Sequence, residues 1–184
     1  MSEIRSAKLS DADRIREIYA PYILQTPITF EIEVPSVNEI AARISEHKGK
    51  FPWLVYEANG IVLGYAYAAP FKSRPAYEWS VEFSVYLDQN SRGAGIGKAL
   101  YATLLEIVKE QGAVNVIGGL TIPNEASVRL HEHFGFKNVA RHKDAGFKLG
   151  KWWDVGYWQL QLPKPEVPRP LRPFGEIEEY LKFE

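Results

Sequence analysis

The stretch Arg92-Gly93-Ala94-Gly95-Ile96-Gly97 places three glycines at alternate positions between a strand pattern and a helix pattern. Before it, residues Ser80 to Leu87 put apolar side chains on one face, which predicts a β-strand. After it, residues from about Lys98 to Gln111 repeat apolar side chains at helical spacing. Glycine permits positive φ and close approach of a ligand, and the N–H groups that begin a helix attract anions. The stretch therefore predicts a cradle for a pyrophosphate, against the alternative of a turn that serves chain geometry alone.

The glycine spacing separates this turn from two other nucleotide-binding motifs. A dinucleotide fingerprint requires G-x-G-x-x-G, whereas the spacing here is G-x-G-x-G. A P-loop ends in Gly-Lys-Ser/Thr, whereas Gly97-Lys98 is followed by Ala99, which has no hydroxyl group for magnesium. A dinucleotide-binding oxidoreductase is therefore disfavoured.

Further strands are predicted on both sides of the turn. The apolar runs Trp53 to Ala58 and Ile61 to Ala69 flank Asn59-Gly60, a pair that suits a type I′ hairpin turn. The other predicted strands are Ile4 to Lys8, Val114 to Thr121, Lys137 to Lys143 and Trp153 to Leu162, with a loop at Asp144 to Lys151.

Capping residues predict three further helices. A short helix spans Asn124 to Phe134, since Asn124 is a good N-cap residue and Gly135 a good C-cap residue. The two N-terminal helices start at capping boxes that pair Ser10 with Asp13 and Ser36 with Glu39.

The order of these elements indicates an α/β fold built on a single mixed, mostly antiparallel central sheet with helices on both faces. One domain is predicted over residues 1–162 and a proline-rich tail over residues 163–184. Five prolines between Pro163 and Pro173 predict an extended strap or linker, and Glu176 to Leu181 is predicted to form one helical turn.

Composition narrows the class of protein. With 46% hydrophobic and 24% charged residues, the 184-residue chain has the composition of a soluble globular domain. It contains no cysteine, which excludes disulfides and thiol nucleophiles and favours a reducing compartment. The net charge of −1 and the interspersed charges argue against nucleic-acid binding. No run of about 20 apolar residues and no signal-peptide pattern is present, so a cytoplasmic location is expected.

Two separated motifs resemble the GNAT superfamily of N-acetyltransferases. The glycine stretch at 92–97 matches its R/Q-x-x-G-x-G/A signature, and Asn124 to His131, followed by Gly135-Phe136, matches its second conserved helix. Further blocks look like phosphinothricin N-acetyltransferases; they are Ala76 to Glu82, Ala145 to Lys148 and Trp153 to Trp158. The resemblance covers nearly the whole chain. It implies a homodimer that acetylates the α-amine of phosphinothricin, methionine sulfone or methionine sulfoximine.

The resemblance also implies acetyl-CoA as co-substrate. No metal is expected, because the His and acidic residues show no ligand spacing such as H-E-x-x-H. The expected cofactor-binding residues are Val85, Tyr86, Leu87, Arg92, Gly93, Ala94, Gly95, Ile96, Gly97, Lys98, Asn124 and Ser127. The backbone of Val85 and Leu87 is expected to pair with the pantetheine arm as an added strand. A backbone N–H there would stabilise the oxyanion of the attacked thioester. Asn124 has a structural role as N-cap as well as the cofactor contact that the resemblance implies.

Two residues are candidates for proton transfer. Glu82 is a carboxylate between apolar neighbours on the strand that enters the glycine turn, where burial would raise its pKa toward that of a working base. The alternative is an outward-facing or salt-bridged glutamate. His131 lies where much of the superfamily has a tyrosine that protonates the leaving thiolate, so a histidine here could act as acid or as base.

Substrate recognition is predicted from loops near these residues. A substrate carboxylate calls for a cation, and Arg74 is the residue that the resemblance carries over. Phe30, Tyr77 and Lys148 are predicted to line the same site, although an aromatic residue is more often part of a core. Two alternatives to this assignment stay open. One is a GNAT enzyme for another amine, such as a polyamine, a protein N-terminus or a lysine; the other is an acetyl-CoA sensor without catalysis.

Overall fold

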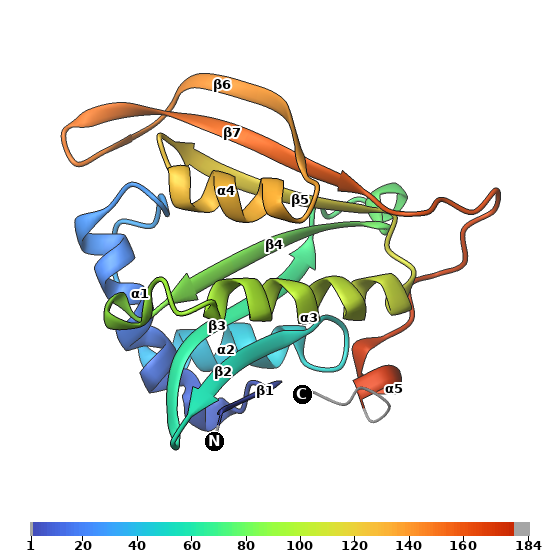
Figure 1. The fold of residues 1–184 in the computed structure, drawn as a ribbon, viewed down its shortest axis with the longest axis horizontal. Helices are drawn as coiled ribbons and strands as arrows, with labels where there is room; N and C mark the ends of the chain where they lie inside the picture. Colours follow the sequence, from blue (N-terminus) through green and yellow to red (C-terminus); the bar gives the residue numbers. More distant parts are fainter. Residues whose placement is uncertain (1, 179–184) are drawn as a thin grey trace.

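The computed structural model describes residues 2–178, which form a seven-stranded sheet in the order β1-β2-β3-β4-β5-β7-β6 (Figure 1). The strands are β1 Ser2–Ser6, β2 Trp53–Ala58, β3 Ile61–Pro70, β4 Ser80–Leu87, β5 Asn115–Ile122, β6 Lys137–Lys148 and β7 Lys151–Gln161. Among these described strands, only β4 and β5 pair in parallel, and the other neighbours are antiparallel. The predicted mixed, mostly antiparallel sheet is confirmed.

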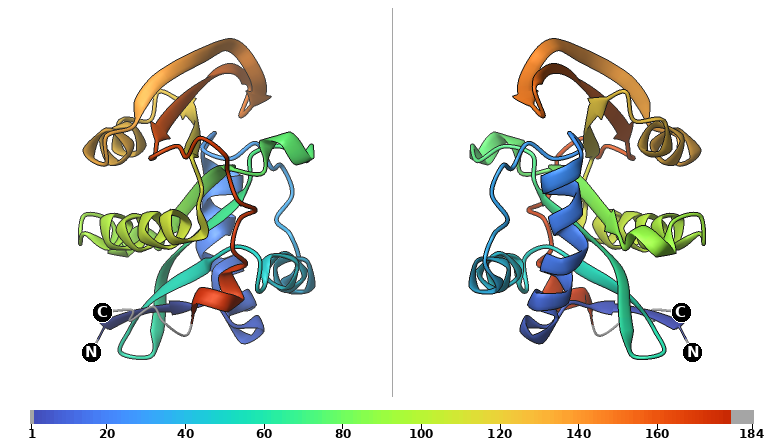
Figure 2. Two further views of the ribbon diagram at one scale, coloured as in Figure 1. Left: turned by 90° about the vertical axis from the view of Figure 1, so that its right-hand side faces the viewer. Right: turned by 90° about the vertical axis from the view of Figure 1, so that its left-hand side faces the viewer.

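Helices cover both faces of the sheet. Figure 2 shows α1 (Ala12–Gln25) and α2 (Val37–His47) on one face and α3 (Ile96–Gln111) and α4 (Glu125–His133) on the other. Each pair of helices encloses a hydrophobic core against the sheet. A last short helix, α5 (Phe174–Ile177), packs near the far end of α3.

The alternation of β4 decides which residues reach each face. Val81 and Phe83 point into the core under α3 and are 0% and 4% exposed. Successive strand residues point to opposite faces, so Glu82 faces the side of α1 and α2. Although its neighbours in the sequence are apolar core residues, Glu82 therefore lies outside the core under α3.

One predicted turn and one predicted capping box are confirmed in detail. Asn59 and Gly60 have φ values of 52° and 79°, and both positive values are required by a type I′ turn. At the start of α2 the Ser36 hydroxyl accepts from the Glu39 N–H, while the Glu39 carboxylate accepts from the Ser36 N–H. These local patterns form as predicted because both partners lie within four residues of each other.

The predicted capping box at Ser10 is wrong. A short 3-10 turn spans Leu9–Asp11 and α1 begins at Ala12, with Asp11 as its N-cap. The Asp11 carboxylate accepts from the Lys8 N–H at 2.7 Å and from the Arg5 guanidinium at 2.8 Å. The ion pair with Arg5 on β1 is a tertiary contact that the local pattern does not contain.

The predicted loop at Asp144 to Lys151 is also wrong. Strand β6 continues to Lys148 and β7 begins at Lys151, joined by a two-residue turn in which Leu149 and Gly150 have φ values of 51° and 79°. The register of β6 shifts between His142 and Gly146. This bulge interrupts the alternation of side chains, which is why the second half of the strand has the pattern of a loop.

The proline-rich segment forms a strap that leaves the sheet after β7 and returns along the end of α3 (Figure 1). The Trp79 indole N–H donates to the Arg169 carbonyl at 2.6 Å, and the Arg172 N–H donates to the Gln111 carbonyl at 2.9 Å. Phe174 and Ile177, each 3% exposed, belong to the α3 core. The predicted helical turn thus begins earlier, at Phe174, and the part predicted beyond Glu178 lies outside the described residues.

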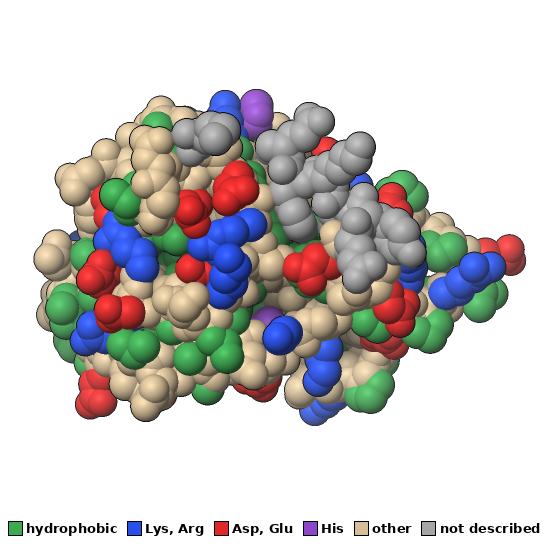
Figure 3. All heavy atoms as spheres, turned by 90° about the horizontal axis from the view of Figure 1, so that it is seen from below, with side chains coloured by type: hydrophobic (Ala, Val, Ile, Leu, Met, Phe, Trp, Pro, Cys, Tyr) green, Lys and Arg blue, Asp and Glu red, His purple; other side chains and the backbone are tan. Residues whose placement is uncertain are grey.

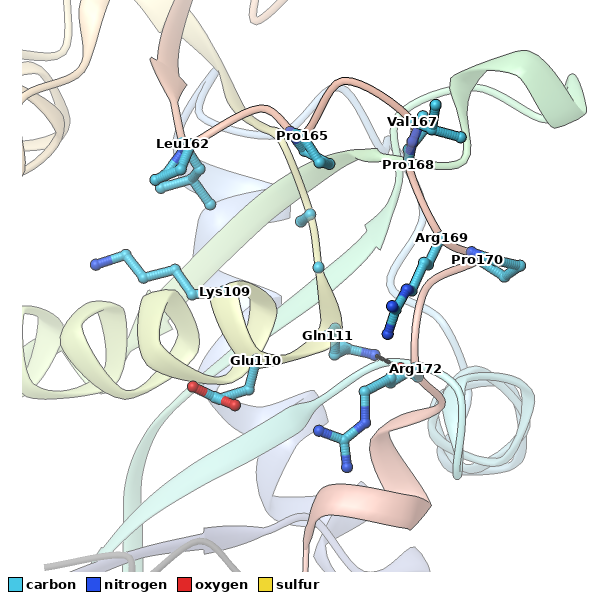
Figure 4. A pocket seen from close by; sticks show the side chains of 13 residues that line it. Lys109, Glu110, Gln111, Leu162, Pro165, Val167, Pro168, Arg169, Pro170 and Arg172 are labelled. Carbon is cyan, nitrogen blue, oxygen red and sulfur yellow. Dashed lines mark hydrogen bonds between the residues drawn. The ribbon is translucent and has the colours of Figure 1, made fainter.

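A cavity of about 610 Å³ lies between the strap and the end of α3 (Figure 4). Gln111 points toward the strap there, and its amide donates to the carbonyls of Arg172 and Lys50. None of the predicted site residues lines this cavity. The strap therefore encloses space away from the candidate site.

Charged side chains of both signs are interspersed on the face seen in Figure 3. Within residues 2–178, no helix has the length and apolarity that crossing a bilayer requires.

Candidate active site

Strands β4 and β5 separate after a short stretch of pairing. They pair only at Ser80–Asn115, Val81–Val116 and Glu82–Ile117, and then diverge (Figure 1). A small cavity of about 50 Å³ lies in this split. Its lining comes from both strands, from α3 and α4, and from the segment after α1: Ile28, Phe83, Ser84, Val85, Tyr86, Tyr101, Gly119, Leu120, Asn124, Ser127 and His131.

The split exposes part of the β4 backbone. The Asp88 N–H donates to the Leu63 carbonyl, so the backbone groups of Val85 and Leu87 point away from β3 and toward β5. At Leu87 both groups are already bonded, since the Tyr22 hydroxyl accepts from its N–H at 3.1 Å and donates to its carbonyl at 2.7 Å. The Tyr22 hydroxyl does not occupy the backbone groups of Val85, which lines the cavity.

The glycine turn leads from β4 into the first turn of α3. Gly93 and Gly95 have φ values of 83° and 81°, so the expectation of positive φ is confirmed at these two positions. The first intrahelical bond runs from the Ala99 N–H to the Gly95 carbonyl, and no side chain caps the helix. The N–H groups of residues 96–98 therefore have no partner within the helix. The Arg92 guanidinium, at the start of the glycine turn, lies 5.1 Å from the centroid of the Tyr22 ring.

His131 is held from both sides of its ring. It is 3% exposed, with Nδ1 at 2.8 Å from the Ser127 carbonyl and Nε2 at 2.7 Å from the Tyr101 hydroxyl. A carbonyl only accepts, so Nδ1 carries the proton and Nε2 accepts from Tyr101. Burial lowers the pKa of His131, partly offset by the bond to Ser127, which keeps the ring neutral near pH 7.

Asn124 and Ser127 begin α4 at the edge of the cavity. The Asn124 side-chain oxygen accepts from the Ser127 N–H at 3.2 Å, which confirms Asn124 as the N-cap. Both residues line the cavity next to His131. Their helix therefore aims its first turn at the split between the strands.

Glu82 lies on the opposite face of β4, against β5. A Cβ atom added to Gly119 would be 3.1 Å from the Glu82 Oε1 atom and 3.4 Å from the Tyr157 ring. Burial raises the pKa of Glu82 above its ordinary value, and the positive charge of Lys72 partly offsets the rise. Glu82 therefore has the environment of a general base and forms none of the structure's side-chain ion pairs with a described residue.

A groove of about 420 Å³ lies on the Glu82 face of the sheet. It is lined by Phe71, Lys72, Tyr77, Ser80, Asn115, Ile117, Val139, Ala140, His142, Tyr157 and Gln159. Ser80 and Ile117 flank Glu82 on this face, because they lie two residues before it and directly opposite it. The volume is in the range of small-molecule sites, about 300–1,000 Å³.

The four predicted substrate residues are not all brought together. Tyr77 lines the groove. Lys148 is 7% exposed and its ammonium group donates to the Thr29 carbonyl at 2.7 Å, while the Phe30 ring lies against Gly146. Arg74 precedes the short turn Pro75–Tyr77 and lines neither the cavity nor the groove.

Several residues of the site are missing from the sequence-based prediction. Tyr101, on α3, has the spacing of a core residue and gives no sign of its bond to His131. Tyr157 and Gln159, on β7, and His142, on β6, reach the groove only through the pairing of distant strands. The polar residues of β7 at alternate positions are the one local signal of a polar face there.

Among residues 2–178, no group of three or more His, Asp or Glu side chains is arranged to hold a metal ion.

Comparison with known proteins identifies the family. The model described as "Acetyltransferase (GNAT) domain" matches residues 4–156. A phosphinothricin N-acetyltransferase of Streptomyces viridochromogenes is 38% identical over 175 residues, which cover 95% of this chain and 96% of that protein. An L-methionine sulfoximine/L-methionine sulfone acetyltransferase of Salmonella typhimurium is 33% identical, over 90% of this chain and 97% of that protein.

A solved structure is similar along the same length. It is a GNAT superfamily phosphinothricin acetyltransferase from Sinorhizobium meliloti in complex with AcCoA, with a TM-score of 0.87 and 36% identity over 92% of each chain. The split sheet, the uncapped glycine turn and these matches agree. The chain belongs to the GNAT family of acetyl-CoA-dependent N-acetyltransferases.

Proposed function

We propose that the protein transfers the acetyl group of acetyl-CoA to the α-amine of a small amino-acid analogue of the phosphinothricin, methionine sulfone and methionine sulfoximine class. The observation that carries the acceptor assignment is the groove beside Glu82, a half-buried carboxylate with a raised pKa next to a space of small-molecule size. The relatives with these activities match nearly the whole chain.

The acetyl-CoA site in this proposal occupies the glycine turn and the split. The N–H groups of Gly93, Ala94, Gly95, Ile96, Gly97 and Lys98, with the side chains of Arg92 and Lys98, hold the pyrophosphate. The pantetheine arm runs along the edge of β4 at Val85, Tyr86 and Leu87, with Val85 offering the backbone groups that face the cavity. Asn124 and Ser127 close the cavity at the start of α4.

The reaction begins with the acceptor amine. A free amino acid carries an ammonium group near neutral pH, and Glu82 takes one of its protons to give the attacking amine. The amine attacks the thioester carbonyl in the split, and the Val85 N–H stabilises the oxyanion. When the C–S bond breaks, the sulfur departs on the His131 side of the cavity.

The acceptor site in this proposal uses Lys72, which lines the groove. Lys72 lies close enough to influence the pKa of Glu82, which suits it to a substrate carboxylate beside the amine. Tyr77 and Arg74 contribute from the loop before β4. Phe30 and Lys148 contribute indirectly, by holding the segment around Thr29. Lys148 donates to the Thr29 carbonyl, and the neighbouring Ile28 lines the cavity. The partners are thus small molecules, with neither nucleic acid nor membrane involved.

Two further elements of the proposal concern the assembly and the compartment. The protein acts as a homodimer, in line with the resemblance to the phosphinothricin N-acetyltransferases. It works in the cytoplasm, and the absence of cysteine from the sequence suits that reducing compartment.

A thiol-release assay tests the acceptor assignment. Purified protein is given acetyl-CoA with phosphinothricin, methionine sulfone, methionine sulfoximine, spermidine or a lysine peptide. We expect turnover with the first three only, and loss of that turnover in Glu82→Gln. Turnover with spermidine or the peptide would replace the acceptor class, and binding of acetyl-CoA without turnover of any amine would make the protein a sensor.

A further inference from the structure

His131 has no ring nitrogen free to meet a substrate. Nδ1 donates to the Ser127 carbonyl and Nε2 accepts from the Tyr101 hydroxyl, at 2.8 Å and 2.7 Å. Both bonds are buried, and Gly118 closes the ring from the side of β5, since a Cβ atom there would be 2.0 Å from Nε2. A proton that reaches or leaves His131 on the cavity side must therefore pass through Tyr101.

The Tyr101 hydroxyl is placed to make that connection. Tyr101 is 0% exposed and lines the same small cavity as Val85 and His131. Its ring is fixed by edge contacts with His131 and Phe83, at centroid distances of 5.2 Å and 5.3 Å. Its oxygen donates one hydrogen to Nε2, and its lone pairs remain for a second donor.

We propose that Tyr101 is a catalytic residue whose hydroxyl relays a proton from the attacking nitrogen to the departing sulfur, with His131 Nε2 holding the proton in between. The proposal rests on the acetyl transfer proposed above. It assigns the second of the two protons that the ammonium group must lose, and Glu82 takes the first.

The proton balance closes within one reaction. The new C–N bond leaves a positive nitrogen that gives its surplus proton to the Tyr101 oxygen, while the Tyr101 hydrogen moves to Nε2. His131 is then an imidazolium with Nδ1–H still on Ser127. The C–S bond breaks with its electron pair going to sulfur, Nε2 returns its proton to Tyr101, and the Tyr101 hydrogen moves to the thiolate. One proton has passed from nitrogen to sulfur, and both side chains are restored.

The ionisation of the two side chains suits this order of events. Burial lowers the pKa of His131, so the ring begins neutral with Nε2 ready to accept. Burial, and then the charge of Glu82, raise the pKa of Tyr101, so the phenol does not remain as an anion. Each relay step therefore moves two protons together, without a long-lived phenolate.

The test compares Tyr101→Phe with the wild type and with Tyr56→Phe, which removes a hydroxyl from a half-buried tyrosine of the same core. Single-turnover acetyl transfer, its solvent deuterium isotope effect and the Kd for acetyl-CoA are measured. We expect Tyr101→Phe to slow transfer by about 100-fold or more, within the range for general acid–base groups, with Kd changed by less than about 2-fold. The isotope effect should be large and multi-proton in the wild type and reduced in Tyr101→Phe.

A second measurement needs no variant. ¹⁵N NMR of the wild-type protein should find the proton of His131 on Nδ1 and none on Nε2, and a proton on Nε2 would overturn the relay. Wild-type transfer rates in Tyr101→Phe, combined with loss of activity in His131→Gln, would also overturn it. If the wild-type protein binds acetyl-CoA but acetylates no amine, the proposed function is wrong, and this result is distinct from a failure of the relay.

Discussion

Gly118 lies directly against the imidazole of His131, so close that a Cβ atom would be 2.0 Å from Nε2 and 2.6 Å from Cδ2. His131 is fixed on α4 by its bond to Ser127, and Gly118 is fixed within β5. A methyl group at position 118 must therefore push the ring away from Tyr101.

Gly118→Ala is expected to lower the rate of acetyl transfer by about 100-fold, the scale of a displaced acid–base group. Crowding of the core should also lower the free energy of unfolding by about 1–3 kcal/mol. Gly156→Ala is the matched control, because its Cβ atom would be 2.5 Å from Trp158 on β7 and does not meet His131. Urea unfolding and single-turnover kinetics separate the two effects, and equal losses of activity in both variants would contradict the special role of Gly118.

Glu82→Gln tests the general base. We expect kcat to fall by about 100-fold or more, because Gln cannot accept the ammonium proton. The substitution should also change how the free energy of unfolding depends on pH. A raised folded pKa means that the folded state binds this proton more tightly than the unfolded state does. The wild type therefore loses stability as pH rises from the ordinary glutamate pKa through the folded pKa. Urea unfolding at a series of pH values should show that Glu82→Gln lacks this pH-dependent contribution to the free energy of unfolding. The same pH dependence in the variant and the wild type would argue against a raised pKa at Glu82.

Gly95→Ala tests the glycine turn. Gly95 has φ 81° with open space around it, so alanine adds about 1–2 kcal/mol of backbone strain without a clash. Relief of that strain would move the N–H groups of the α3 start, and we expect the Kd for acetyl-CoA to rise at least about 10-fold in calorimetry. Gly60→Ala is the matched control, at φ 79° in an open hairpin turn. It should lose similar stability and bind acetyl-CoA normally.

Lys72→Met tests the acceptor groove. We expect the KM for the amino-acid analogue to rise by about 10-fold, the effect of roughly 1.4 kcal/mol of lost charge pairing, with the KM for acetyl-CoA unchanged. The charge of Lys72 holds down the pKa of Glu82, so the acidic limb of the pH–rate profile should also move to higher pH. Lys109→Met, under the strap, is the control for loss of a lysine. A Lys72→Met variant with normal kinetics would place the substrate carboxylate elsewhere, with Arg74 as the next candidate.

Phe174→Ala tests whether the strap belongs to the folded domain. Phe174 is 3% exposed in the α3 core, and truncation of such a side chain costs about 3–5 kcal/mol. Val167→Ala, at a residue that is 79% exposed, should change stability by less than about 0.5 kcal/mol. If urea unfolding finds Phe174→Ala as stable as Val167→Ala, a domain that ends at residue 162 becomes the better description.

Features carried by neighbouring residues could be predicted from the sequence. The Asn59-Gly60 hairpin turn, the Ser36 capping box and the Asn124 cap depend on partners at most four residues away, and all three are confirmed. The glycine turn belongs to the same class, because positive φ at Gly93 and Gly95 is a property of those residues themselves.

Features that depend on tertiary contacts could not be predicted in this way. Asp11, not Ser10, holds the N-cap position of α1, and its carboxylate accepts from Arg5 of β1. Lys148 reaches Thr29 across 119 residues of sequence, and Tyr101 reaches His131 across 30. None of these contacts leaves a local pattern, so Lys148 has the sequence context of a substrate ligand and Tyr101 that of a core residue.

Gly118 and Gly119 are adjacent on β5 at the point where β4 and β5 separate, so the sheet there consists of backbone without side chains. Gly118 faces the imidazole of His131 and Gly119 faces the carboxylate of Glu82, so β5 places no side chain against either group at these two positions. In the proposed mechanism, the acetyl-donating side and the amine-accepting side are therefore separated by the backbone of β5 alone, and they are lined by different residues. On that placement, substitutions on β6 and β7 would change the lining of the amine groove and leave the lining of the small cavity unchanged, which would give this scaffold a route to new acceptors with the same chemistry.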